Sequence, residues 1–280
     1  MIDIEAIEKN YFYFDEPVPF ELKKDKKTIY IYPITVRNSE YFRSSVGILT
    51  IDKNSIPDPK IISMSYLQFM CESLFADKEL GQAYISAMYN IMHLCLGLKA
   101  PAIKWENNRP FIYDLEQGVE ISAKEFDSIK RIILYQNFLH YDDTYISPEA
   151  KQAMEETAQL KNANIDFPNL ERRMAIISSH TGILKKDQIQ MTMRAHDALL
   201  EEVRGEVDYI GSLNAILIAD AFAKDKREHS EWVYRRKRSK FEGYFVSDKD
   251  YNKSMGGNGN ITQTTTNKAT ELANKFNNFK

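Results

Sequence analysis

The stretch SAKEFDSIKRIILYQNFL, residues 122–139, marks the point at which the pattern of the chain changes. Its first four residues have the spacing of a capping box, in which the Ser122 side chain satisfies the amide of Glu125 and the Glu125 carboxylate reaches back. This spacing predicts a helix that runs from there through Leu139. Sequence before this helix contains strand patterns as well as helices, whereas sequence after it is helical almost throughout.

Two β-hairpins are predicted before this helix. Residues 19–36, PFELKKDKKTIYIYPITV, contain a short apolar strand, a charged turn and a strand rich in Ile, Tyr and Thr. Pro33 cannot donate to a strand ladder, so the second strand should lie at a sheet edge or end there. Residues 102–114, AIKWENNRPFIYD, predict a second hairpin around Asn107 and Asn108.

The sequence between the hairpins predicts two helices. Apolar residues in 67–75 and in 80–98 repeat at the spacing of a buried helical face, and Asp77 is placed to cap the second helix. The short loop between them predicts an αα-hairpin. Residues 38–51, NSEYFRSSVGILTI, fit two structures, because Asn38 could cap a helix while the run VGILTI suits a strand.

Further helices are predicted after residue 140. Ser147 and Pro148 have the pattern of a cap followed by proline at the first helical position. Pro168 should open another helix, which Gly182 closes. One face of a third helix is marked by Ile189, Met193, His196, Leu200 and Val203. Residues 207–223 are apolar nearly all round, which predicts a central helix.

These patterns predict an α+β fold that is mostly α-helical, with N-terminal β-hairpins packed on helices and a helical C-terminal half. We expect an α+β region with both hairpins in residues 1–120 and a helical region in 121–246. Residues 247–280 are polar and rich in Gly, Asn and Thr, which is typical of a flexible tail. A weak amphipathic pattern at the end of this tail predicts a short terminal helix.

Composition favours a cytoplasmic protein with a sizeable core. The 280 residues are 43% apolar and 28% charged, and the formal net charge of −3 gives no global attraction to phosphate. Cys71 and Cys95 are too few for a disulfide framework. No apolar run approaches the roughly 18 residues that a membrane helix needs, and the first residues lack a signal-peptide pattern.

No catalytic, cofactor or metal site is predicted. His93 and Cys95 stand two apart on a predicted helix and so point to different faces, while His196, on an apolar face, fits a satisfied core histidine. No serine elbow, P-loop or dinucleotide fingerprint is present. The acidic pairs Asp142–Asp143 and Asp197–Glu201 are explained by solvated surfaces.

Features of binding surfaces are more plentiful. The run YFYF, residues 11–14, should close over a core, although an exposed aromatic patch would mark an interface. Residues 224–240 contain eight basic and three acidic side chains, with Trp232 and Tyr234 among them. Such a segment could bind phosphate, or Trp232 could anchor it to the core while the basic residues face water. The candidate partner-binding residues are Trp232, Tyr234, Arg235, Arg236, Lys237, Arg238, Tyr11 and Phe12.

Five stretches, in this order, resemble one family. They are ISMSYLQFM (62–70), FDSIKRIILYQN (126–137), LERRMAIISSHTG (170–182), DQIQMTMRAHDALL (187–200) and HSEWVYRRKRSKFEGYF (229–245). The residue patterns of these stretches and their order, following an N-terminal hairpin, are similar to those of the tail assembly chaperones of tailed bacteriophages. These chaperones are encoded next to the tape-measure protein. The similarity spans about residues 18–246, and none of its motifs is catalytic.

The resemblance implies a non-enzymatic protein without cofactors. It would bind the tape-measure protein until tail-tube subunits polymerise around it, and would help to recruit those subunits. Self-association is a further possibility, and no membrane partner is expected. Two alternatives remain open: a nucleic-acid-binding phage protein that uses the basic segment 224–240, and a structural or connector component of the virion.

Overall fold

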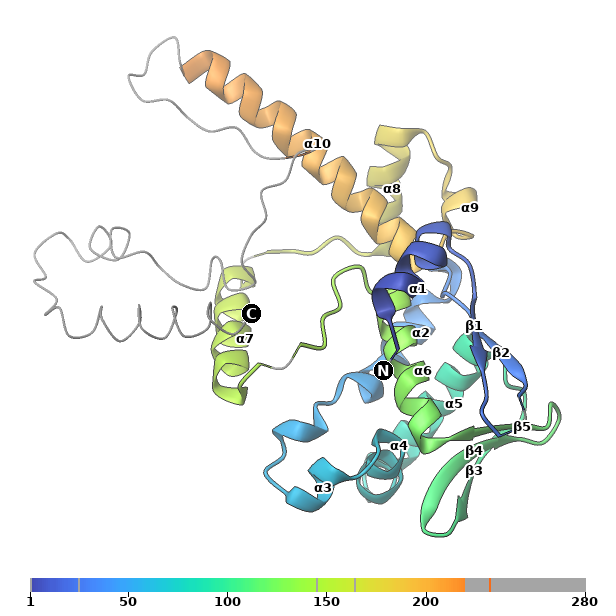
Figure 1. Cartoon of the computed structure of the whole chain (residues 1–280). Coiled ribbons are helices and arrows are strands. Elements are labelled where there is room, and N and C mark those ends of the chain that lie inside the picture. Colours follow the sequence, from blue (N-terminus) through green and yellow to red (C-terminus); the bar gives the residue numbers. More distant parts are fainter. Residues whose placement is uncertain (1, 25, 145, 164, 220–231, 233–280) are drawn as a thin grey trace, which may run out of the picture. The chain divides into compact units, whose positions relative to one another are not determined.

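The computed structural model describes residues 2–24, 26–144, 146–163, 165–219 and 232. These residues form an α+β fold, mostly α-helical, with two small antiparallel sheets (Figure 1). They fall into two compact units, of which the smaller contains α7 (Pro148–Asn162). The larger unit contains α1 (Ile4–Asn10), η1 (Phe12–Phe14), β1 (Val18–Glu21), β2 (Thr28–Ile31), η2 (Val36–Asn38), α2 (Ser39–Thr50), η3 (Lys53–Ser55), α3 (Pro59–Ser63), α4 (Tyr66–Phe69), η4 (Met70–Leu74), α5 (Gly81–Leu96), β3 (Pro101–Glu106), β4 (Arg109–Asp114), β5 (Val119–Ser122), α6 (Ala123–Asn137), α8 (Leu170–Thr181), α9 (Lys185–Gln188) and α10 (Met193–Ala219).

Both predicted hairpins are confirmed. In the first sheet β1 pairs antiparallel with β2, which ends two residues before Pro33. In the second, Glu106 pairs with Arg109, so Asn107 and Asn108 form a two-residue turn with φ angles of 50° and 59°. A third strand, β5, pairs with the far side of β4 and was not predicted.

Helix α6 lies at the centre of the larger unit. Its capping box at Ser122 and Glu125 is confirmed, and its buried apolar residues occupy more than one face. It packs against α1, α4, β2, β4 and β5, which come from the first 122 residues, and against α10. The hydrophobic core accordingly includes residues from Phe12 to Met193, so the expected boundary at residue 120 falls inside one core.

The segment left open in the sequence, residues 38–51, is helical. It forms α2, which buries Phe42, Val46 and Leu49 on one face at a spacing of four and three residues. Asn38 occupies the cap position, but its side chain makes no capping hydrogen bond. Burial of this face against α5 selects the helix over the strand.

The two helices expected before the second hairpin differ from the prediction. Residues 66–74 begin as the α-helix α4 and continue as a π-helix, η4. The Asp77 carboxylate accepts from the amides of Glu79 and Leu80, so it caps a turn, and α5 begins only at Gly81. Because α5 packs mainly on α2 and α4 packs on α6, the expected αα-hairpin is replaced by contacts with two different helices.

Helix α8 begins at Leu170, two residues later than Pro168 predicts, after its cap Asn169, whose side chain accepts from the Arg172 amide. Gly182 closes it with a φ of 75°, as expected. Just before α10, Thr35 pairs with Thr192 in an isolated antiparallel bridge, and the Met193 amide donates to the Ile34 carbonyl. This bridge fixes the start of α10 to the segment that follows β2.

Helix α10 is a single helix of 27 residues that joins two predicted helices. Its beginning is buried at Met193, His196 and Val203, whereas Val207 and Ile210 are 47% and 50% exposed. The prediction of a central helix over 207–223 is therefore wrong for its described part. An apolar composition shows that a helix can be buried, but a neighbouring element must be present to bury it.

Helix α7, in the smaller unit, has the predicted start, because the Ser147 side chain accepts from the Ala150 amide and Pro148 occupies the first turn. Leu160 on this helix is 79% exposed. None of the helices in the described part of the chain has a stretch long and apolar enough to cross a membrane.

Candidate functional site

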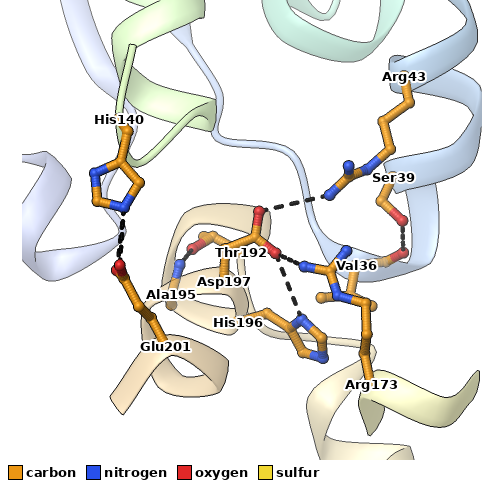
Figure 2. A network of polar contacts seen from close by, with 10 residues as sticks. All are labelled: Val36, Ser39, Arg43, His140, Arg173, Thr192, Ala195, His196, Asp197 and Glu201. Atoms are coloured by element: carbon orange, nitrogen blue, oxygen red, sulfur yellow. Dashed lines mark hydrogen bonds and ion pairs between the residues drawn. The ribbon is translucent and has the colours of Figure 1, made fainter. Parts of the chain in front are cut away.

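A groove of about 590 Å³ lies between the segment after α6 and one side of α10. Across it, His140 Nε2 lies 3.1 Å from Glu201 Oε2 (Figure 2). Both side chains are partly exposed, so this pair is open to solvent. The groove is lined by Thr50, Phe138, Leu139, His140, Tyr141, Asp197, Leu200, Glu201 and Arg204.

The chain reaches this groove because α6 ends at a buried asparagine. Asn137 Oδ1 accepts from the Ile34 amide at 2.7 Å, and Asn137 Nδ2 donates to the Ile133 carbonyl at 2.9 Å. These bonds fix the point at which residues 138–141 leave the helix. The Phe138 ring then packs against Phe42 with centroids 5.9 Å apart, which joins this side of the groove to α2.

The opposite side of the groove is fixed by an ion-pair network around Asp197. Its carboxylate accepts from Arg43 of α2 at 3.5 Å and from Arg173 of α8, so it links both helices to α10 (Figure 2). Burial acts to raise the pKa of Asp197, but His196 and the two guanidinium groups outweigh burial and hold this pKa below its ordinary value. The carboxylate is therefore ionised at neutral pH and acts as a structural anion.

His196 is a core residue, as predicted, but it is not satisfied. It is 2% exposed, and its Nδ1 lies 4.0 Å from Asp197 Oδ1. Its Nε2 is buried and has no hydrogen-bond partner among the described residues. The sequence correctly placed this ring on a buried face, but the spacing of apolar residues carries no information about its partners.

The acidic pairs of the sequence have separate partners in the structure. Asp143 accepts from Arg131 and from the Tyr135 hydroxyl, whereas Glu201 faces His140 and Asp197 faces arginines. Within the described ranges, no three His, Cys, Asp or Glu residues are grouped so that they could hold a metal ion.

A second groove, of about 300 Å³, lies between η4, α5 and the edge strand β3. Its lining is mostly apolar and includes the Cys71 side chain. Burial raises the pKa of the Cys71 thiol to about 12, so this thiol is protonated at neutral pH and is a poor nucleophile.

An apolar stripe leads out of the first groove along α10. It comprises Leu200, Val203, Val207 and Ile210, whose spacing of three and four residues places them on one side of the helix. We call these four residues the α10 stripe. Val203 is buried, but Val207 and Ile210 are about half exposed, so the stripe continues beyond the elements that cover its beginning.

The structure places three of the predicted partner-binding residues. Phe12 is 3% exposed and belongs to the core, and Tyr11 is half-buried. In the same run, Tyr13 and Phe14 are the residues that face solvent, with 63% and 67% of their surface exposed. The run YFYF therefore divides between core and surface: Phe12 closes over the core, as expected of the run, while Tyr13 and Phe14 are exposed.

Trp232 lies against α10. Its indole nitrogen donates to Glu202 Oε2 at 3.2 Å, and its ring centroid is 5.9 Å from that of Tyr209. A Cβ added to Gly205 would lie 2.8 Å from the Trp232 ring, so only glycine leaves room for this contact. The other predicted residues, Tyr234, Arg235, Arg236, Lys237 and Arg238, lie outside the described residues, as do the rest of segment 224–240 and the tail 247–280.

Comparisons with protein-family models, with curated proteins and with solved structures found no match for this chain. The groove and the α10 stripe are therefore interpreted from their own geometry. Sequence reasoning missed His140 and Arg204 and assigned Glu201 to a solvated surface, because these three residues come together only when the end of α6 lies beside α10. It did identify the apolar face that contains Val203, but it predicted that the following residues were buried.

Proposed function

We propose that this chain is a non-enzymatic assembly chaperone of a tailed bacteriophage, which binds the tape-measure protein and helps to recruit tail-tube subunits. The observation that carries the proposal is the α10 stripe, which is buried at Val203 and exposed at Val207 and Ile210. A protein that coats a long helical partner needs an exposed apolar surface of this kind. The order of sequence motifs supplies the identity of the partner.

The stripe suits reversible binding. Full burial of a valine or isoleucine side chain stabilises a complex by about 1.5–3 kcal/mol, and half of each surface is already covered here. Val207 and Ile210 together would then contribute about 1.5–3 kcal/mol, which corresponds to roughly a 10- to 150-fold change in affinity. A contribution of this size allows a chaperone to hold its partner and later to release it to the tube subunits.

The double substitution Val207→Glu and Ile210→Glu tests the proposal. Co-expressed with the tape-measure protein of the same phage, the unchanged chain should keep that protein soluble and co-purify with it. The double variant should lose at least about tenfold in affinity, because two charges would have to be buried on binding. Its fold should be unchanged, since both side chains are half exposed; circular dichroism and thermal melting check this.

A matched control replaces Leu115 and Leu184 by glutamate, because these leucines are 66% and 55% exposed and lie outside α10. This control should bind the tape-measure protein like the unchanged chain. The proposal fails if the unchanged chain does not bind that protein, or if the α10 double variant binds it equally well.

The alternative of nucleic-acid binding depends on segment 224–240. Trp232, which would stack on bases in that alternative, instead packs its ring on Gly205 and Tyr209. DNA binding that weakens with salt and disappears when Arg235, Arg236 and Arg238 become alanine would favour this alternative over the chaperone. A fixed copy number in purified virions would favour a structural component.

A further inference from the structure

We propose that α10 recognises an amphipathic helix whose apolar stripe is bordered by lysine or arginine side chains. The inference deepens the proposed function, on which it rests, by naming the chemistry of the partner surface. It combines two observations on the same helix: the exposed end of the α10 stripe and the acidic side chains that border it.

The shape of the exposed surface favours a helical partner. Residues of the α10 stripe repeat every three or four positions, which is the spacing that lets the side chains of two helices interdigitate. From Leu200 to Ile210 the stripe is about 15 Å long, which matches roughly three turns of a second helix. A helix that lies along it would reach the groove beside His140 with one end and cover Val207 and Ile210 with the other.

The charge beside the stripe favours a basic partner. Three carboxylates of residues 201–208 lie beside the stripe, from Glu201, Glu206 and Asp208, together with one guanidinium group, from Arg204. Glu202 lies on the other side of α10, where its carboxylate accepts from the Trp232 indole. On the exposed surface, Arg204 Nε lies 3.7 Å from Asp208 Oδ2. No described residue forms an ion pair with Glu206. The border of the stripe is therefore net negative, which attracts lysine and arginine and repels phosphate.

The same charges argue against a second copy of α10 as the occupant. If two α10 helices paired along their stripes, the acidic border of one would face the acidic border of the other, in either direction of pairing. Like charges that meet in this way destabilise a helix pair and act against the wrong partner. A helix with basic borders meets no such repulsion.

Two synthetic helical peptides provide the test. They share one apolar stripe and differ only in its borders, which are lysine in one and glutamate in the other. With the full chain, fluorescence anisotropy should show that the lysine peptide binds at least about tenfold more tightly at low salt, and that the difference shrinks as salt screens the charges.

The substitutions Glu206→Lys and Asp208→Lys should reverse this preference. The lysine peptide should lose about tenfold in affinity and the glutamate peptide should gain, because the border of the stripe becomes basic. The control Glu79→Lys with Glu155→Lys makes the same change in net charge at exposed positions outside α10, and should leave the preference as it was.

The outcomes separate this inference from the proposed function. Equal binding of both peptides, or a preference unaffected by charge reversal on α10, overturns the inference even if the tape-measure protein still binds through Val207 and Ile210. If the lysine peptide is preferred but the tape-measure protein does not bind, the chemistry of the partner stands and the proposed function fails. A dimer in sedimentation that Ile210→Glu dissociates, and that binds neither peptide, identifies a second copy as the occupant and also overturns the inference.

Discussion

Asn137 shows how one polar side chain can place a binding groove. Its side chain is fully buried, and both of its polar atoms are used by backbone partners, one of which is 103 positions away in the sequence. The capping box that begins α6 could be recognised from residues three apart. The partner of Asn137 could not, because the amide of Ile34 reaches it only after the first hairpin has packed on α6.

Replacing Asn137 by leucine should lower the free energy of unfolding by about 2–3 kcal/mol, because the buried Ile34 amide would lose its acceptor. Urea unfolding followed by circular dichroism measures this change. Asn162→Leu, at an exposed position at the end of α7, is the matched control and should change stability by less than about 0.5 kcal/mol. A similarly small effect of Asn137→Leu would show that the Ile34 amide finds another acceptor.

Asp114 is a second buried polar residue with a structural role. Its carboxylate accepts hydrogen bonds from the amides of Lys99, Ala100 and Gln117 at 2.8–2.9 Å, and so joins the two ends of the β3–β4 hairpin. Burial acts to raise the pKa of Asp114, but these backbone donors outweigh burial and hold the pKa below its ordinary value. The ionised form is therefore favoured by folding.

The lowered pKa of Asp114 makes the stability of the protein depend on pH in the acidic range. Because the folded pKa of Asp114 is lowered, its contribution is fully present above the unfolded pKa of about 4 and is lost as the pH falls through the folded value. Asp114→Asn should destabilise the protein at pH 7, and the difference between the two proteins should shrink below about pH 4. Urea midpoints measured from pH 7 to pH 3 test this expectation, and a difference that stays constant with pH would contradict it.

The turn between β3 and β4 illustrates what a sequence can predict about an element. Asn107 and Asn108 both have positive φ angles, which the two-residue turn of a hairpin requires, and asparagine tolerates this conformation better than most residues. The turn could therefore be predicted from these two residues alone. Strand β5 could not, because its four residues are stabilised mainly by pairing with β4.

Asn108→Gly should raise the free energy of unfolding by about 0.5–1 kcal/mol, because glycine adopts positive φ without steric cost and Asn-Gly is the favoured pair in this turn. Thermal and urea unfolding measure the gain. Asn10→Gly is the control, since Asn10 ends α1 without a positive φ and should give no gain. If both variants are destabilised alike, the turn does not limit the stability of the hairpin.

The limits of sequence reasoning are clearest in the helices before the second hairpin. The apolar spacing in 67–75 correctly indicated a buried helical segment, but not the π-helix that it contains. The start of α5 depends on Gly81, where an added Cβ would lie 2.6 Å from the Phe75 carbonyl oxygen. Contacts between neighbouring elements, which leave no periodic signal, decide both features.

For the molecule as a whole, the fold class could be predicted, but the surface that we propose for binding could not. Hydrophobic periodicity indicates that α10 has an apolar side. However, a helix that is buried along its whole length would show the same pattern. The burial of Val203 and the exposure of Val207 depend on where the neighbouring elements end. The candidate site is therefore a property of tertiary packing.

The bridge between Thr35 and Thr192 has a consequence for protein synthesis. The two segments that it joins are made at very different times, because a ribosome that adds about 5–20 residues per second needs roughly 8–30 s to proceed from one to the other. Until then the backbone groups of Ile34 and Val36 lack the partners that Met193 and Met191 provide. Until these partners are made, the nascent chain therefore carries unpaired backbone groups in residues 34–36, which can pair with other chains.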